Sequence, residues 1–190
     1  ALGLPAARAL ALHDFRGRRV VEWLLMMPIV VPGLVVVMGI HVALIRVGLA
    51  DTLPGVVLVH LAPALPYFIL VMAGVFATYS TELEETARTL GASPGRVFLY
   101  VTLPGIFPGL LVATMFTFLV SWTQYITTVL VGGGAVITLP MVLFPLIGAA
   151  NHAVAAAVSI VFVVPALLIL VYTARTMHQN VESMGALGKL

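Results

Sequence analysis

The strongest constraint on the fold of this chain is a series of four long apolar segments. They cover residues 23–45, 56–77, 106–131 and 153–174. A helix needs about 20 apolar residues to cross the hydrocarbon core of a bilayer, and each segment meets that length. The runs are continuous rather than alternating, which excludes an outer-membrane barrel. The sequence therefore predicts an all-α polytopic transmembrane helical bundle that forms a single transmembrane domain over residues 1–190.

The composition excludes several other classes of protein. Only 8% of the residues are charged, whereas soluble domains contain roughly 25%, so the chain cannot cover a water-facing surface of ordinary polarity. The absence of cysteine excludes disulfides, thiolate catalysis and Cys-ligated zinc. No basic cluster is interleaved with aromatic residues, so we expect no nucleic-acid partner.

Proline residues predict that several of these helices are irregular. Pro28 and Pro32 predict a bend in the first span, because proline removes a backbone donor. Pro63 and Pro66 predict a broken helix in the second span, either lining a cavity or acting as a hinge, with a simple packing kink equally open. Residues 135–150 are too short and too interrupted to span with ease, so they predict a short interfacial or re-entrant helix on the outer side.

Basic residues define the orientation. A basic segment over residues 6–22 is expected to lie in the cytoplasm beside the membrane lipid. A more specific interpretation adds contact with anionic lipid or with a cytoplasmic partner. Counting spans from there places eight of the nine Lys/Arg inside and only Arg46 outside. The opening residues ALGLPA resemble the end of an earlier apolar helix, so we expect the first span or spans of the natural protein to be missing from this chain.

A polar block at residues 79–105 separates the second and third spans on the predicted cytoplasmic side. Its sequence predicts a helix, a turn and a second helix. Thr81 and Glu84 fit a capping box, and Glu84 and Arg88 are spaced as an i,i+4 ion pair. Gly91 fits a left-handed helix end, and Ser93 fits the cap of the second helix. A short, well-capped helix held between two spans suits the transmission of force from a soluble partner, although an ordered connecting loop is the simpler interpretation.

The spacing within this block resembles the EAA loop of permease subunits in binding-protein-dependent ABC importers. The matching residues are Glu85-Thr86-Ala87, then Gly91 after three residues, then the hydrophobic-x-Leu-Pro group that ends at Leu103-Pro104. Thr86 replaces the usual middle alanine. Residues 121–139 are similar to the corresponding region of permeases for polyamines, ferric iron, thiamine and phosphonates.

This resemblance implies a type I ABC importer permease fold in the bacterial plasma (inner) membrane, as a multi-pass protein. It implies a second permease subunit, alike or different, a cytoplasmic ABC ATPase dimer, and a periplasmic or lipoprotein solute-binding protein. ATP and Mg would be bound by the ATPase, and we expect no cofactor, metal or catalytic residue in this chain. The residues expected to couple to the ATPase are Glu84, Glu85, Thr86, Ala87, Arg88, Gly91, Leu103 and Pro104.

The absence of a G-x-x-x-x-G-K-[ST] motif supports a transport subunit that is not itself an enzyme. A passive channel or an ion-coupled carrier would need intramembrane carboxylates or a filter-like loop, and neither is present. From the resemblance we expect a small polar solute such as a polyamine, with ferric iron, thiamine or a phosphonate as alternatives.

Because the spans contain no Asp or Glu, recognition of the solute would depend on aromatic faces, hydroxyls and backbone carbonyls. His41 and His60 lie inside spans, and we interpret each first as a neutral imidazole bonded to a neighbouring helix, with a role along a solute path as the alternative. The candidate residues for the solute path, all equally open to a role in packing, are Tyr67, Ser121, Trp122, Gln124 and Tyr125.

Overall fold

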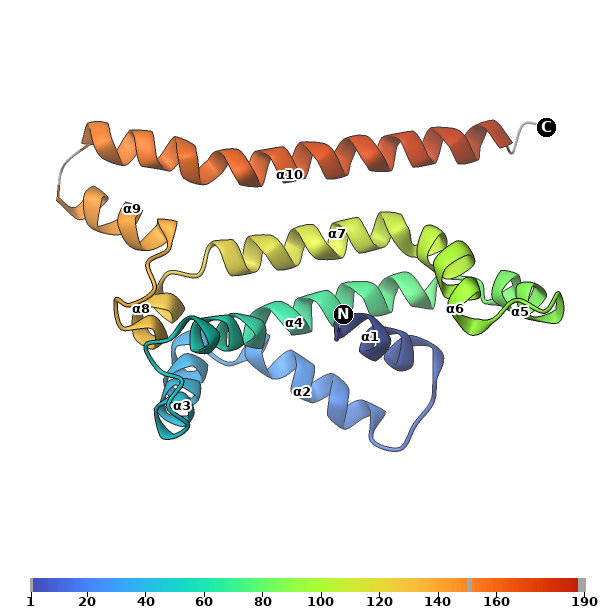
Figure 1. The fold of residues 1–190 in the computed structure, drawn as a ribbon, viewed down its shortest axis with the longest axis horizontal. Coiled ribbons are helices and arrows are strands. Elements are labelled where there is room, and N and C mark those ends of the chain that lie inside the picture. Colours follow the sequence, from blue (N-terminus) through green and yellow to red (C-terminus); the bar gives the residue numbers. More distant parts are fainter. Residues whose placement is uncertain (1, 150–151, 188–190) are drawn as a thin grey trace.

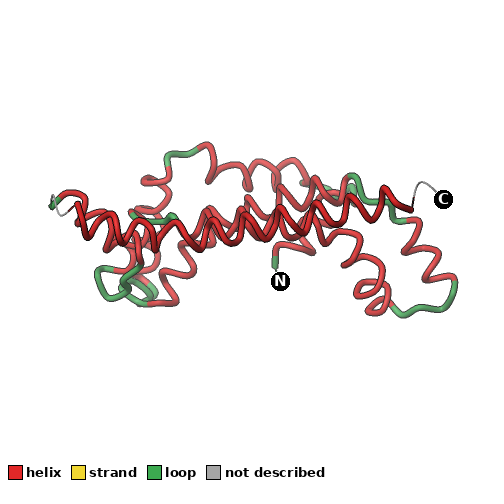
Figure 2. Tube along the Cα trace, turned by 90° about the horizontal axis from the view of Figure 1, so that it is seen from above, coloured by secondary structure: helices red, strands yellow, loops and turns green. Residues whose placement is uncertain are grey.

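The computed structural model describes residues 2–149 and 152–187, with side chains in the last helix described as far as Met177. Lys189, one of the basic residues predicted to lie inside, falls outside this part. The described residues form helices and loops and contain no strand, which confirms the all-α fold (Figures 1 and 2). The helices are α1 Gly3–Leu12, α2 Arg18–Val30, α3 Gly33–Arg46, α4 Leu53–Ala77, α5 Glu82–Thr89, α6 Pro94–Val97, the π-helical turn η1 Phe98–Thr102, α7 Leu103–Trp122, α8 Ile126–Gly132, α9 Leu139–Gly148 and α10 His152–Leu187.

Helices α4, α7 and α10 run along the long axis of the molecule (Figure 1). Helix α4 lies at the centre, with α7 on one side and α1 on the other. Ala7 and Leu10 of α1 share a buried cluster with Met72 and Phe76 of α4 and with Ile106 of α7. A second cluster joins α3, the first turns of α4, and α8. Two separate cores therefore hold α4, one toward each of its ends.

Three described helical stretches are long and apolar enough to cross a membrane, namely residues 53–77, 94–122 and 152–177. The pair α2 and α3 adds a fourth span only if it is counted as one segment, because the two helices meet at an angle of 106°. The predicted bend in the first span is therefore present, and it is a sharp one. It falls at Val31 and Pro32, where the backbone leaves the helical conformation.

The predicted break in the second span is absent. Helix α4 is continuous over 25 residues and includes both Pro63 and Pro66. Membrane helices tolerate proline because neighbouring groups satisfy the freed backbone atoms. Here Pro66 is buried, and α4 packs against both α1 and α7.

The structure divides the chain differently around the predicted third span, residues 106–131. A helix begins at Pro94, passes through the π-helical turn η1 and ends at Trp122, and α8 follows as a separate short helix. The hydroxyl of Thr123 donates to the carbonyl of Leu119 at 2.9 Å and so helps to close the end of α7. Helix α9 is shorter than residues 135–150, and α10 continues past residue 174.

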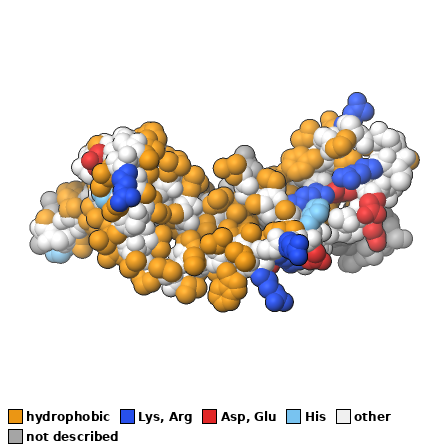
Figure 3. Space-filling view, turned by 90° about the horizontal axis from the view of Figure 1, so that it is seen from below, with side chains coloured by type: hydrophobic (Ala, Val, Ile, Leu, Met, Phe, Trp, Pro, Cys, Tyr) orange, Lys and Arg blue, Asp and Glu red, His pale blue; other side chains and the backbone are white. Residues whose placement is uncertain are grey.

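Charged side chains gather mainly toward one end of the molecule, and hydrophobic side chains cover its middle (Figure 3). Helices α5 and α6 lie at one end of the long axis, and α3 and α8 lie at the other (Figure 1). Arg46, the basic residue predicted outside, ends α3 at this second end. We refer to the α5 end as the cytoplasmic end, because the sequence predicts that it lies on that side of the membrane.

Candidate functional site

Helix α5 is placed at the cytoplasmic end by a tight reversal of the chain. Gly91 has a φ of +85°, a left-handed conformation that glycine adopts at little cost. Its amide donates to the carbonyl of Arg88 at 2.9 Å, and the amide of Ala92 donates to Ala87 at 3.0 Å. These bonds end α5 as the sequence predicts.

The predicted capping box is wrong. Thr81 has a helical backbone, and its side chain makes no capping bond. The hydroxyl of Ser80 instead accepts from the amide of Glu82 at 3.3 Å. Glu84 does not fold back toward Thr81, because its carboxylate is bound by residues from other helices. Ser93 precedes α6 as predicted, but its side chain makes no capping bond.

Glu84 is the buried centre of this end of the molecule. Its carboxylate accepts two hydrogen bonds from Arg8 of α1, from Nη1 to Oε1 at 2.9 Å and from Nη2 to Oε2 at 2.6 Å. The hydroxyl of Thr102, the last residue of η1, donates to Oε1 at 2.7 Å. Glu84 is 3% exposed, so these three bonds replace its contacts with water. We call Arg8, Glu84 and Thr102 the Glu84 cluster.

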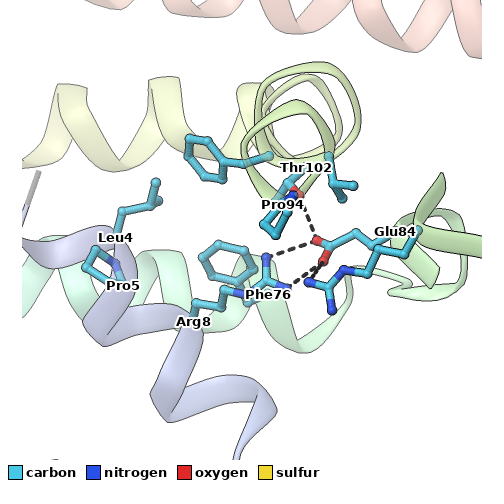
Figure 4. A pocket seen from close by; sticks show the side chains of 10 residues that line it. Leu4, Pro5, Arg8, Phe76, Glu84, Pro94 and Thr102 are labelled. Atoms are coloured by element: carbon cyan, nitrogen blue, oxygen red, sulfur yellow. Dashed lines mark hydrogen bonds and ion pairs between the residues drawn. The ribbon is translucent and has the colours of Figure 1, made fainter. Parts of the chain in front are cut away.

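The surroundings of the Glu84 cluster are mainly apolar (Figure 4). The guanidinium of Arg8 lies over the ring of Phe76 at 5.9 Å, a distance suited to a cation–π contact. Nη2 of Arg88 lies 3.9 Å from Oε2 of the same carboxylate. The predicted i,i+4 ion pair is therefore present, with a long separation. A pocket of about 500 Å³ opens beside the cluster and is lined in part by Leu4 and Pro94.

The electrostatics of this cluster favour an ionised carboxylate. The hydrogen bonds from Arg8 lower the pKa of Glu84 below its usual range, against the opposing effect of burial, and the bond from Thr102 lowers it further. Glu84 is therefore charged at neutral pH. The carboxylate lies between the guanidinium groups of Arg8 and Arg88, so it forms ion pairs and does not serve in proton transfer.

Another side of α5, away from the buried Glu84, is exposed. Leu83 of α5 is 66% exposed, and Leu90, the residue that follows α5, is 82% exposed. Thr86 and Ala87 lie between them on the same side of the helix, because positions i, i+3, i+4 and i+7 share one face. We call residues 83, 86, 87 and 90 the outer face of α5. Two exposed leucines beside small residues form a surface suited to a partner.

The remaining residues of the predicted coupling set lie in different places. Glu85 and Gly91 are exposed, and the side chain of Arg88 is 58% exposed. Leu103 and Pro104 belong to the first turn of α7, in a helix that continues into the bilayer segment. The structure therefore brings Glu85, Arg88 and Gly91 to the surface near the outer face of α5, whereas Glu84 points inward.

A second polar centre lies where α4, α7 and α8 meet. His60 Nδ1 is 3.0 Å from Ser121 Oγ, and His60 Nε2 is 2.9 Å from Thr128 Oγ1. Thr128 donates its own hydroxyl proton to the carbonyl of Gln124. In the neutral imidazole the proton therefore lies on Nε2, which donates to Thr128, and Nδ1 accepts from Ser121. The structure thus shows His60 bonded to neighbouring helices.

A cavity of about 610 Å³ lies beside this centre, between α4 and α7. Its wall contains His60 and Ser121, the hydroxyl-bearing Thr114 and Thr117, and the ring of Phe68. It therefore combines hydroxyl groups with an aromatic surface. Of the predicted residues for the solute path, Ser121 lines this cavity.

The other four residues predicted for the solute path lie elsewhere. Trp122 stacks between Phe118 and Phe162, and its indole N–H donates to the carbonyl of Phe162 at 3.1 Å. Gln124 accepts a hydrogen bond from the hydroxyl of Thr127. The ring of Tyr125 packs on that of Phe144, and Tyr67 is exposed on α4. Trp122 and Tyr125 thus make the packing contacts that the sequence left open.

Sequence reasoning missed two members of the Glu84 cluster. The sequence shows Arg8 only as part of a basic segment, and Thr102 only as a variable position within a motif. An isolated arginine in the otherwise apolar run of residues 3–12 was the available signal, because such a charge needs a partner. In the part of the chain that the structure describes, no three His, Asp or Glu side chains converge as metal ligands would.

The family described as "Binding-protein-dependent transport system inner membrane component" matches residues 1–180. The trehalose transport system permease protein SugB of Mycobacterium tuberculosis is 31% identical over 141 residues, which are 74% of this chain and 52% of that protein. The diacetylchitobiose uptake system permease protein DasC of Streptomyces coelicolor is 30% identical over 177 residues, 92% of this chain and 64% of that protein. The molybdenum transport system permease protein ModB of Mycobacterium tuberculosis is 31% identical over 190 aligned positions, 92% of this chain and 72% of that protein.

These similarities confirm the predicted resemblance to importer permeases. The chain spans about half the length of curated relatives such as SugB. The names of the three relatives refer to two sugars and to molybdenum. They do not support the expectation of a polyamine.

Proposed function

The chain belongs to the family of inner-membrane components of binding-protein-dependent transport systems, and from this premise we propose that it forms part of the permease of an ATP-driven solute importer. The match over residues 1–180 carries this proposal. ATP would be bound and hydrolysed by a separate cytoplasmic ATPase dimer. A second permease subunit and a solute-binding protein outside the membrane would complete the transporter.

The outer face of α5 is the proposed docking surface for the ATPase. Leu83 and Leu90 are exposed at the cytoplasmic end, where no lipid would cover them. Burying each leucine against a partner would contribute about 1.5–3 kcal/mol. Glu85, Arg88 and Gly91 border this face and supply charge and a close backbone approach. The EAA-type spacing of these residues supports the same assignment.

The helix that follows α5 gives the docking surface a direct route into the membrane. Residues 94–122 form one helical stretch that begins three residues after Gly91 and continues through α7. A shift of α5 during ATP binding would therefore act on the cytoplasmic end of a membrane helix. This arrangement supports conversion of ATPase closure into opening of the permease.

The cavity between α4 and α7 is the proposed contact site for the solute. Its hydroxyls and aromatic ring suit an oxygen-rich solute such as a sugar, and hydroxyls also suit a small oxyanion. The described helices α4, α7 and α10 up to Met177 contain no carboxylate that would attract a polyamine. The trehalose, diacetylchitobiose and molybdenum names of the relatives point the same way. We therefore propose a sugar or an oxyanion in place of a polyamine.

A docking experiment tests the coupling assignment in the full-length transporter. The Gly91→Trp variant is expected to lose the ATPase during affinity purification, because the large side chain would block approach to α5. Gly134→Trp is the matched control, since Gly134 has a φ of +83°, Gly91 has a φ of +85°, and a Cβ added at either position would meet no atom within 4 Å. Retention of the ATPase by Gly91→Trp, or equal loss in both variants, would contradict the proposal.

The solute is tested on the binding protein that delivers it. A thermal-shift titration with trehalose, diacetylchitobiose, molybdate and spermidine separates sugars, oxyanions and polyamines. Stabilisation by a sugar or by molybdate is expected. Stabilisation by spermidine alone would overturn the proposed solute class.

A further inference from the structure

We propose that Glu84 is a positioning residue that links the coupling helix α5 to α1 and to η1, the turn from which α7 continues. We further propose that Glu84 does not contact the ATPase. This inference rests on the proposed function, since it concerns how a movement of α5 reaches the membrane helices. It assigns a role to Arg8 and Thr102, which lie outside the EAA-type residues.

The carboxylate of Glu84 is fully engaged inside the chain. Arg8 binds both of its oxygens in the bidentate geometry that matches a guanidinium to a carboxylate. Thr102 donates a third bond at 2.7 Å. A direct contact with a partner would require these bonds to break. Glu82 and Glu85, the other acidic residues of α5, are exposed.

Arg8 is held on a rigid base. Ala7 and Leu10, on either side of it in α1, are buried against α4 in the cluster that includes Met72. Gly3 lies so close to Phe68 of α4 that an added Cβ would overlap the ring. Helix α1 is therefore packed tightly on α4, and a side chain anchored to Arg8 is anchored to both helices.

Three elements meet at this one carboxylate. Glu84 belongs to α5, Arg8 to α1, and Thr102 to η1, from which α7 continues. Without the Glu84 cluster, α5 would be joined to the membrane helices mainly through short loops at its two ends. With the cluster, a displacement of α5 is passed to α1 and α7 together. Figure 4 shows these side chains converging from separate ribbons.

Assembly and coupling should therefore be separable by mutation. In Glu84→Gln the outer face of α5 is unchanged, so the complete transporter should still contain the ATPase. The amount of solute imported per ATP hydrolysed should fall about tenfold, within the usual range of coupling between sites. Thr102→Val should lower this ratio less, because it removes one of three bonds. Glu82→Gln is the matched control, since Glu82 is an exposed acid in the same helix.

A reversed ion pair tests the geometry itself. The double variant Arg8→Glu with Glu84→Arg should recover import per ATP relative to either single variant, because the opposite charges again meet. A pair of cysteines at positions 8 and 84 provides a second test that does not depend on charge, and this sequence contains no cysteine of its own. Import should be low in the reduced cysteine pair and should recover when a short bifunctional thiol reagent joins the two positions.

The experiments are carried out on the complete transporter in proteoliposomes, with solute uptake and phosphate release measured together. Loss of the ATPase from purified Glu84→Gln, but not from Glu82→Gln, would assign Glu84 to docking and overturn the inference. An unchanged uptake per ATP in Glu84→Gln would overturn it as well. If Glu84→Gln fails to fold, uptake by the variant with cysteines at positions 8 and 84, before and after cross-linking, tests the inference instead. Inhibition of uptake by the cross-link would contradict the inference. Absence of an ATPase from the wild-type complex would instead contradict the proposed function.

Discussion

His60 and Thr128 lie 68 residues apart in the sequence and join α4 to α8 through a contact of 2.9 Å between the imidazole Nε2 and the threonine hydroxyl. The other imidazole nitrogen is bound to Ser121 of α7. One side chain therefore holds three helices together at the point where the chain leaves α7. Both bonds are part-buried beside the cavity between α4 and α7, and together they fix the position of the imidazole.

Replacement of this imidazole is expected to lower the stability of the protein. His60→Ala removes two hydrogen bonds that contribute about 1 kcal/mol each, so we expect a loss of about 2–3 kcal/mol once packing is included. Thermal unfolding of the detergent-purified protein measures it. His41→Ala is the matched control, because His41 Nδ1 is buried without a hydrogen-bond partner. Equal losses in the two variants would show that the bonds of His60 contribute nothing beyond packing.

Local sequence patterns predicted those parts of the fold that depend on local interactions. The apolar segments predicted where α4, α7 and α10 lie, because burial in a bilayer requires a minimum length. Gly91 predicted the end of α5, because few residues other than glycine adopt its φ of +85°. The EAA-type spacing predicted the family that the comparisons confirm.

The features of the structure that the sequence did not predict depend on contacts between residues that are distant in the sequence. Thr81 and Glu84 have the spacing of a capping box, but Arg8, 76 residues from Glu84, offers two charged hydrogen bonds in place of one backbone amide. The residues around position 123 are polar, and α7 ends there. The average hydropathy of residues 106–131 is nevertheless high enough that the sequence predicts one span in place of α7 and α8. No periodic pattern in the sequence records which distant partner a single charged or polar residue will find.

A glycine is expected to be required at position 133 because the side chain of Asp51 lies close to it. Gly133 has a φ of +50°, and an added Cβ would overlap the carboxylate of Asp51. Gly134 has a φ of +83° but open space around it. Gly133→Ala should therefore destabilise the protein more than Gly134→Ala, by about 1 kcal/mol, because the overlapping carboxylate is the end of a side chain that can turn away. Thermal unfolding compares the two variants.

The same steric overlap predicts a rescue. Asp51→Gly removes the carboxylate, and it also relieves the positive φ of 57° that Asp51 itself adopts. Combined with Gly133→Ala, it should restore most of the lost stability. A double variant no more stable than Gly133→Ala alone would show that the overlap with Asp51 is not the cause.

The two exposed leucines, Leu83 in α5 and Leu90 directly after it, are expected to contribute to ATPase binding without stabilising the permease. Leu83→Ser and Leu90→Ser should each weaken binding of the purified ATPase by about tenfold or more, since each leucine would lose about 1.5–3 kcal/mol of burial. A titration with the transporter in lipid nanodiscs measures the affinity. Thr89→Ser is the control, because Thr89 is exposed outside the outer face of α5. Unaltered affinity in both leucine variants would place the docking surface elsewhere.

The charge on Glu84 predicts how the stability of the protein depends on pH. The hydrogen bonds from Arg8 lower the pKa of Glu84 in the folded state below its ordinary value of 4.5. A carboxyl group with a lowered pKa stabilises the fold fully above its unfolded pKa, and this contribution is lost as the pH falls through the folded pKa. Wild type should therefore exceed Glu84→Gln in unfolding temperature by a constant amount from about pH 8 to about pH 5. Below pH 4.5 the difference should shrink, because Glu84 then takes up a proton first in the unfolded state and, at lower pH, in the folded state as well. Thermal unfolding over this range measures it, with Glu82→Gln expected to follow wild type, whereas a difference that grows on acidification would mean that Glu84 is not held as a carboxylate by Arg8.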